Sequence, residues 1–138
     1  MSDIHEQVAE LFRLDGARIP GFNGDEAKAE AEAILSCRGR RYCVVRDWII
    51  VDVDVPADYR VALTEEGLEP FVLYAEDRVL HSGGTWRKRG YVRTTFSTSK
   101  PEPHVFRTRD MTFVLMGQGC RKTASLEVVM AIANRRLV

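Results

Sequence analysis

The chain has 138 residues, of which 45% are hydrophobic and 29% are charged, and 20 basic residues balance 20 acidic ones. This length fits one compact domain, and the composition excludes a disordered chain, a collagen-like repeat and a disulfide-rich miniprotein. The sequence contains no apolar run of about eighteen residues, which excludes a membrane-spanning helix. The first residues include acids where a secretory signal would carry basic residues, so we expect a cytoplasmic protein.

The cysteines agree with this expectation. Cys37, Cys43 and Cys120 are odd in number and show no C-x-x-C spacing, and the first two flank a basic turn at residues 38–41. Together with the three histidines they form no ligand set with the spacing of structural zinc. We therefore expect no cofactor, and a buried role for Cys43 and Cys120.

The net charge of zero conceals two opposed blocks. Residues 1–80 hold 17 acidic and 9 basic residues, a net charge of −8, whereas residues 81–138 hold 3 acidic and 11 basic residues, a net charge of +8. The two blocks can fold against each other so that their charges mix on one surface. Alternatively, the second block contributes a basic face suited to nucleic acid or to an acidic protein.

Hydrophobic periodicity predicts two helices near the N-terminus. Ile4, Val8, Leu11 and Phe12 follow helical spacing within residues 3–14. Residues 17–24 contain a proline and two glycines and indicate a loop. Residues 25–36 are rich in alanine and predict a second helix, with Asn23 and Glu26 spaced like a capping pair.

The next residues change to the alternation of strands. Strands are predicted at residues 42–46 and 48–55, with Ile49, Val51 and Val53 on one face and Asp52 and Asp54 on the other. Pro56 begins a predicted helix over residues 56–66, which Gly67 ends. Further strands are predicted at 71–75 and 79–81, separated by a charged turn at 76–78.

The second half of the chain is predicted to be mostly extended. Strands are expected at 91–98, 104–108 and 111–116, with a proline-containing loop at 100–103, and helical spacing returns within residues 122–136. Residues 97–99 (Ser-Thr-Ser) are expected to face solvent. The whole chain is therefore predicted to be a single α+β domain over residues 1–138. Its mainly antiparallel sheet of five or six strands is packed by N-terminal and C-terminal helices.

One candidate anion site lies at residues 117–123, between an apolar strand and the predicted last helix. Free backbone N–H groups at such a turn attract phosphate, and Gly119, Arg121 and Lys122 would form the site. A Walker loop is excluded because arginine, not glycine, precedes Lys122. The alternative is a tight turn whose glycines supply unusual backbone angles.

Asp52 and Asp54 suggest a second site, since two carboxylates on one strand face can bind a divalent metal. A third oxygen ligand would be needed, and the sequence does not place one beside them. The alternative is a solvated strand face whose acids protect an edge against aggregation.

The most suggestive stretch mixes cations with aromatic rings. Cations can follow phosphates while rings stack on bases, a combination used on single strands and RNA. Its candidate residues for nucleic-acid or partner binding are Trp86, Arg87, Lys88, Arg89, Tyr91 and Arg93. The alternative is that the aromatic residues anchor the sheet and the cations are solvated.

Four segments, at residues 47–52, 91–95, 106–109 and 114–123, resemble an uncharacterised family of small bacterial proteins, over residues 37–130. Some members of that family lie near phage-derived or mobile genes, which implies a small accessory or inhibitor protein. The resemblance assigns no catalytic residue.

These observations lead to three functional hypotheses. The first is a non-enzymatic binding or regulatory protein that acts on another macromolecule, such as an inhibitor in phage–host conflict. The second is a nucleic-acid-binding module that uses the basic-aromatic stretch. The third is a small metal-dependent enzyme with a site around Asp52 and Asp54. An unidentified protein is the expected partner, nucleic acid is the alternative, no membrane is involved, and a homodimer stays open.

Overall fold

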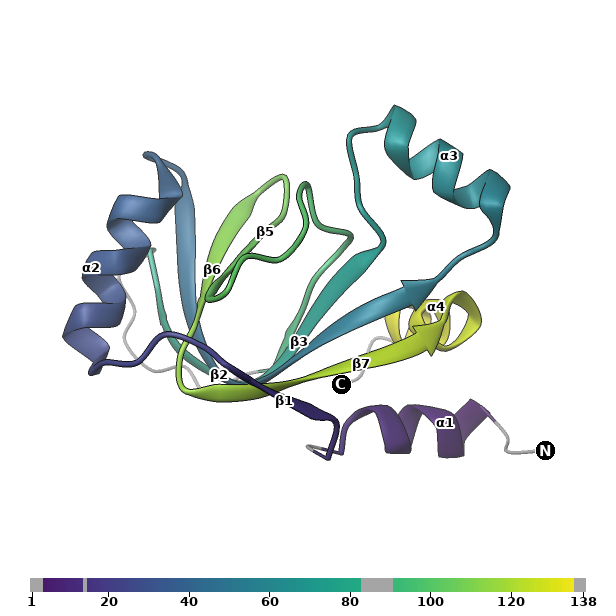
Figure 1. The fold of residues 1–138 in the computed structure, drawn as a ribbon, viewed down its shortest axis with the longest axis horizontal. Helices are drawn as coiled ribbons and strands as arrows, with labels where there is room; N and C mark the ends of the chain where they lie inside the picture. Colours follow the sequence, from purple (N-terminus) through teal and green to yellow (C-terminus); the bar gives the residue numbers. More distant parts are fainter. Residues whose placement is uncertain (1–3, 14, 83–90, 136–138) are drawn as a thin grey trace.

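The computed structural model describes residues 4–13, 15–82 and 91–135. Within these residues, strand β2 (Arg41–Asp54) is the central element of the fold. Figure 1 shows it crossing the molecule from the side of α2 to the side of α3. The helices are α1 (Ile4–Leu11), α2 (Glu26–Cys37), α3 (Ala57–Glu65) and α4 (Leu126–Arg135). The other strands are β1 (Ala17–Pro20), β3 (Phe71–His81), β4 (Val92–Arg93), β5 (Val105–Arg107), β6 (Met111–Leu115) and β7 (Gln118–Ser125).

The α+β class is confirmed, but the sheet is mixed, with four antiparallel and two parallel strand pairs among the described residues, and it has seven strands instead of the expected five or six. Among the described residues it has seven strands in the order β1-β7-β2-β3-β4, with β6 also on β2 and β5 on β6. β2 is antiparallel to β3 but parallel to both β6 and β7. The residue pattern predicts where strands lie, but it does not say which distant strand pairs with which.

The sheet bends where the neighbour of β2 changes from β6 to β7. β6 pairs with residues 41–45 of β2, and β7 pairs with residues 49–54. Between these two stretches Asp47 has a φ of 51°, and Gly117, in the link from β6 to β7, has a φ of 67°. Both φ values lie in the left-handed region, so β2 and the link from β6 to β7 change direction at the same place.

Apolar residues are buried on both faces of this bent sheet. One core lies beneath α1 and α4 and contains Ile49, Val51 and Val53, which confirms their predicted common face. The opposite face buries Trp48 and Ile50 with residues of β5 and β6. A third cluster lies beneath α2 and includes Ala29 and Ala33. β2 therefore holds the cores together, and its continuous apolar run reflects burial on both sides.

Each predicted helix exists, with shifted ends. α2 is capped by Asp25, whose Oδ1 accepts a hydrogen bond from the Lys28 backbone N–H at 2.8 Å, rather than by Asn23. α3 follows Pro56, and Gly67 has a φ of 72° just after it, as expected. α4 begins only at Leu126, because residues 118–125 form β7.

Four predictions about extended segments and loops are wrong. The predicted loop at 17–24 contains β1, which pairs with β7, and the predicted turn at 76–78 lies inside β3. The predicted strand at 91–98 is reduced to two residues in β4. Ser97 is fully buried instead of facing solvent, because its backbone bonds Phe71 and Glu69 and draws it beneath the sheet. Among the described residues, no helix is long and apolar enough to cross a membrane.

Candidate functional site

The basic-aromatic stretch is only partly described by the structure. Trp86, Arg87, Lys88 and Arg89 lie outside the described residues. Tyr91 is 69% exposed, next to β4. The guanidinium carbon of Arg93 lies 5.0 Å from the centroid of the Tyr91 ring and 5.2 Å from that of Phe12. Arg93 is thus held between two aromatic rings, and one of them belongs to Phe12, the residue that follows α1.

The structural context predicted for the anion site is wrong, because residues 118–125 form a strand and not a turn before a helix. A Cβ on Gly119 would lie 2.2 Å from the Trp48 ring, so this glycine makes room for an indole rather than for a phosphate. Arg121 donates two hydrogen bonds to the Asp52 carboxylate, at 2.9 and 3.1 Å. Lys122 pairs with Asp15 at 2.6 Å. Both cations therefore already have a carboxylate partner.

The same pairs bear on the charge blocks and on the metal hypothesis. Three contacts join the acidic block to the basic block, as the mixed-surface alternative predicts. They are Asp52–Arg121, Asp15–Lys122 and the contact of His104 with Glu32 at 3.1 Å. Asp52 is occupied by Arg121, and Asp54 is the exposed last residue of β2. No group of three His, Cys, Asp or Glu side chains that could hold a metal ion occurs in the described part of the chain.

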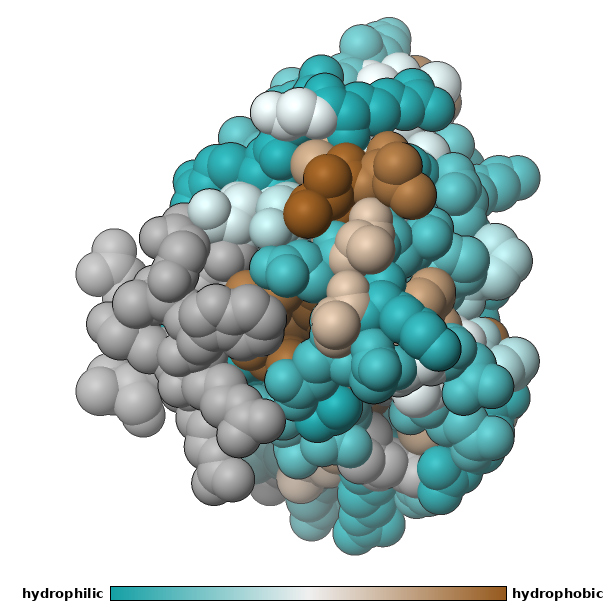
Figure 2. Space-filling model, turned by 90° about the vertical axis from the view of Figure 1, so that its left-hand side faces the viewer, coloured by the Kyte–Doolittle hydropathy of each residue, from teal (hydrophilic) through white to brown (hydrophobic). Residues whose placement is uncertain are grey.

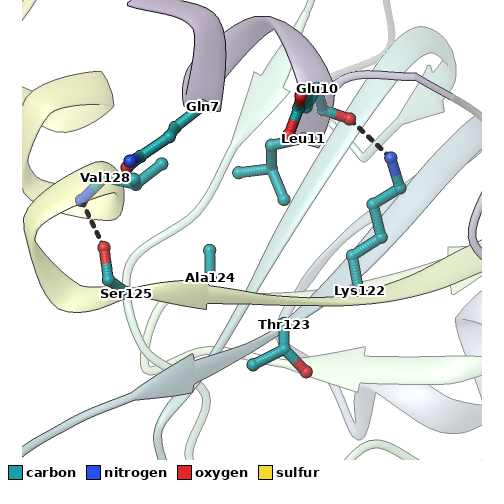
Figure 3. Close-up of a pocket in the computed structure, with 8 residues that line it drawn as sticks. All are labelled: Gln7, Glu10, Leu11, Lys122, Thr123, Ala124, Ser125 and Val128. Atoms are coloured by element: carbon teal, nitrogen blue, oxygen red, sulfur yellow. Dashed lines mark hydrogen bonds between the residues drawn. The ribbon is translucent and has the colours of Figure 1, made fainter. Parts of the chain in front are cut away.

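A cleft of about 400 Å³ lies between α1, β7 and the start of α4 (Figure 3). Two of its polar side chains, Lys122 and Ser125, have structural roles. Lys122 donates to the Glu10 carbonyl oxygen, and the Ser125 Oγ accepts the Val128 backbone N–H at 3.2 Å. In this cleft, hydrogen bonds therefore connect α1 to β7 and the end of β7 to the first turn of α4.

A different pocket, of about 340 Å³, lies between the end of α2 and the β5–β6 hairpin, and we call it the arginine pocket. It is lined by three arginines, four hydroxyl-bearing side chains and one cysteine: Ser36, Cys37, Arg38, Arg40, Thr98, Arg107, Thr108 and Thr112. This lining contains no carboxylate. The residues from α2 arrive because Arg38 and Gly39 take left-handed φ values of 53° and 80°, which end the helix and turn the chain into β2.

The three arginines of this pocket differ in their contacts. Arg107 donates to Glu102 Oε1 at 2.8 Å and to the Ser36 carbonyl oxygen at 3.2 Å. Its positive charge therefore lies at the C-terminal end of α2, where the helix dipole is negative. Arg38 and Arg40 are exposed, and within the described residues neither forms an ion pair or a side-chain hydrogen bond. Two cations of the pocket are thus available to an outside anion.

A second pocket free of carboxylates lies on the other face of the same strands. It measures about 250 Å³, and its lining includes Arg41, Arg78, Arg93 and Tyr91 above an apolar floor of Met111 and Phe113. Arg41 stands opposite Met111 in the β2–β6 register. Arg38, Arg40 and Arg41 therefore bring cations to both pockets at the start of β2, whereas Arg93 lies farther along the sheet, opposite Tyr74. The sequence signal for this end is three arginines within residues 38–41, a run that periodicity analysis does not evaluate.

The exposed face of α2 is the main apolar surface of the described residues. Ala27, Ala31, Ile34 and Leu35 follow helical spacing along it, and we call this set the α2 stripe. Ile34 is 55% exposed and Leu35 is 77% exposed. Figure 2 views this side and shows hydrophobic side chains gathered along it. The alternating acids and alanines of α2 predict a helix, but only the structure shows which face of α2 is left exposed by the other described elements.

The fold and its pockets define a small α+β domain with one arginine-rich end. A family comparison matches residues 20–131 to the domain of unknown function DUF6957, and the chain belongs to this family. No curated protein and no solved structure matches the chain significantly. The family match confirms the expected resemblance to uncharacterised proteins and assigns no activity.

Proposed function

We propose that this protein is a non-enzymatic nucleic-acid-binding protein that holds backbone phosphates in the arginine pocket. The observation that carries the proposal is the pocket lining of three arginines and four hydroxyl groups with no carboxylate. Guanidinium groups bind phosphate oxygens through two parallel hydrogen bonds.

The surroundings support a polyanion rather than a single phosphate. Arg41 and Arg78 line the neighbouring pocket, so cations continue past the tip of the sheet. Tyr91, a residue that is 69% exposed, lies in the same lining, and an exposed aromatic ring offers a base a stacking face. A strand of phosphates with unstacked bases fits this combination, so a single-stranded nucleic acid is the proposed ligand.

The test is fluorescence anisotropy of labelled single-stranded DNA and RNA, titrated with the protein at about 50 mM and about 200 mM salt. The test variant carries Arg38→Asn and Arg40→Gln, where asparagine suits the left-handed conformation of residue 38. The control variant carries Arg18→Asn and Arg60→Gln, which remove two exposed arginines outside both pockets.

We expect binding that weakens with salt and a salt slope that falls by about 1.4 in the test variant, because each phosphate contact on a single strand contributes about 0.7. The control variant is expected to keep the original slope. Equal losses in both variants would point to net charge and not to the pocket. No binding at the lower salt concentration would overturn the proposal.

The α2 stripe supports a second candidate, a protein–protein contact, which was the leading hypothesis from the sequence. The partner that fits its pattern is a second copy of this chain. If two α2 helices pack antiparallel around Ala31, Ala27 of one copy faces Leu35 of the other. Asp25 then faces position 37 and lies next to Arg38, so a small side chain meets a large one and opposite charges lie near each other at both ends.

Analytical ultracentrifugation over a range of concentrations tests this candidate. Leu35→Lys is expected to abolish the dimer, whereas Val61→Lys, which changes a 57% exposed residue of α3, is expected to preserve it. A monomer at all concentrations would exclude the homodimer. The α2 stripe would then be the proposed contact surface for a different protein, including a target in phage–host conflict.

A further inference from the structure

A third pocket lies beneath α1, away from the arginine pocket, and we call it the α1 pocket. It measures about 250 Å³ and is formed by α1, β2, β3 and β4. Val8 and Ile49 are buried and Phe12 and Tyr74 stack at 5.4 Å, so much of its wall is apolar and aromatic. The pocket also holds charges of both signs, which is unusual for a surface between packed elements.

Arg93 supplies the positive charge. It stands opposite Tyr74 in the β3–β4 register, so both side chains face α1. Its guanidinium lies between the rings of Phe12 and Tyr91, which fixes its orientation. Its Nε is buried and has no hydrogen-bond partner among the described residues. A buried donor without an acceptor costs free energy, and a carboxylate placed beside it would supply the acceptor.

Asp47 and Glu76 supply the negative charges. They lie between the register pairs Arg46–Asp77 and Trp48–Ala75, and therefore oppose each other across β2 and β3. Both are exposed, and neither forms an ion pair within the described residues. Like charges placed opposite each other destabilise a sheet, and Asp47 also holds a φ of 51°. Both costs would be offset by a cation seated between the two carboxylates.

We propose that the α1 pocket binds a small zwitterion with an apolar body, namely a free apolar or aromatic amino acid. Its carboxylate pairs with the Arg93 guanidinium, its ammonium group faces Asp47 and Glu76, and its side chain lies against Phe12 and Tyr74. A pocket of this volume is below the usual range for drug-sized ligands, which agrees with a ligand of about a dozen heavy atoms.

Arg38, Arg40 and Arg107 do not line this pocket, but Tyr91, Val92 and Arg93 line both it and the second pocket. The variants distinguish the two proposals, because Arg38→Asn with Arg40→Gln changes no residue of the α1 pocket and Glu76→Gln changes no residue of the other two pockets.

Isothermal titration calorimetry of the full chain tests the proposal with four probes. L-phenylalanine and L-leucine carry both charges, phenylacetate carries only the carboxylate, and phenethylamine carries only the ammonium group. We expect at least one amino acid to bind, and to bind about tenfold more tightly than either single-charge probe, because each of these lacks one ion pair. A single-charge probe that binds as tightly, or no binding of any probe up to about 10 mM, would overturn the proposal.

Variants assign the charges. Arg93→Gln is expected to weaken amino-acid binding about tenfold, Arg93→Lys to weaken it less, and Glu76→Gln to weaken it through the ammonium group. Arg18→Gln and Glu65→Gln change exposed residues outside the pocket and serve as controls. If Arg93→Gln fails to fold, the comparison of Glu76→Gln with Glu65→Gln decides. Equal affinity in those two variants would also contradict the assignment.

Discussion

Trp48 donates its indole Nε1 proton to the Met116 carbonyl oxygen over 3.0 Å, and this bond ties β2 to the link between β6 and β7. The indole is fully buried at the bend of the sheet, where Asp47 and Gly117 take left-handed φ values. Gly119 lies directly against the ring. The bend therefore brings together one large side chain, one carbonyl and two glycines, Gly117 and Gly119.

Gly119→Ala is the sharpest test of this arrangement. The new Cβ would lie 2.2 Å from the Trp48 ring, and a ring packed on all sides cannot retreat. We expect the free energy of unfolding to fall by about 2–3 kcal/mol, as measured by urea denaturation. Thr123→Ala, at an exposed position of the same strand, is the control and should change stability far less. Equal stability of the two variants would show that the ring moves.

Ser97→Ala should act in the opposite direction. The Ser97 hydroxyl is buried and has no hydrogen-bond partner among the described residues, so removing it removes a desolvation cost. We expect the free energy of unfolding to rise by about 1 kcal/mol. Ser99→Ala, two residues further on and partly exposed, should leave it nearly unchanged. A clear loss of stability in Ser97→Ala would mean that the hydroxyl has a partner.

The contact of Glu32 with His104 predicts a dependence of stability on pH. The hydrogen bond from His104 lowers the pKa of Glu32 below its ordinary value of 4.5. Because the pKa is lower in the folded chain, Glu32 contributes stability above the pKa of the unfolded chain, and this contribution disappears as the pH falls through the folded pKa. Urea denaturation from neutral pH to below 4.5 should show a smaller decline in Glu32→Gln than in the unchanged protein. Glu65→Gln, at an exposed position of α3, should decline like the unchanged protein.

Cys43 should resist alkylation in the folded protein. Burial raises the pKa of its thiol to about 12, so almost no reactive thiolate is present at neutral pH. Iodoacetamide labelling followed by mass spectrometry should modify Cys43 only after urea is added. Cys37, which is 6% exposed against 1% for Cys43, should react first of the two. Labelling of Cys43 in the native protein would show that this part of the sheet opens.

Divalent metals should leave the melting temperature unchanged. The Asp52 carboxylate is bound by Arg121 through two hydrogen bonds, and the described residues offer no third ligand beside Asp54. Asp52→Asn should cost at most about 1 kcal/mol, because both side chains of the pair are about 40% exposed. A rise in melting temperature with Mg²⁺, Mn²⁺ or Zn²⁺ that Asp52→Asn abolishes would restore the metal hypothesis.

The sequence was sufficient for the helices and for the apolar core of β2, because both follow from local periodicity. It was insufficient wherever a distant partner decides the outcome. Residues 118–125 look like a turn and a helix start until β2 and β1 pair with them. Gly119 was assigned to an anion because glycine suits phosphate loops, whereas the neighbour that requires a glycine lies 71 positions earlier, at Trp48.

The candidate sites show the same limit. Arg121 and Lys122 were predicted from their own segment, but Asp52 and Asp15, remote in sequence, neutralise them. The arginine pocket combines the end of α2 with the β5–β6 hairpin, and the α1 pocket combines four elements. Neither combination has a local signature, so no motif search along the chain could have found it.

The parallel pairing of β2 with β7 also constrains how the chain is made. Val51 pairs with Lys122, so after Val51 a ribosome must add 71 further residues (122 − 51), about half of the chain, before this edge of β2 acquires its partner. Until then β2, paired with β3, presents an unpaired apolar edge, which is the kind of surface that associates with other nascent chains. Folding of this domain is therefore expected to be late and limited by long-range pairing, and a chain that stops before β7 should aggregate rather than fold.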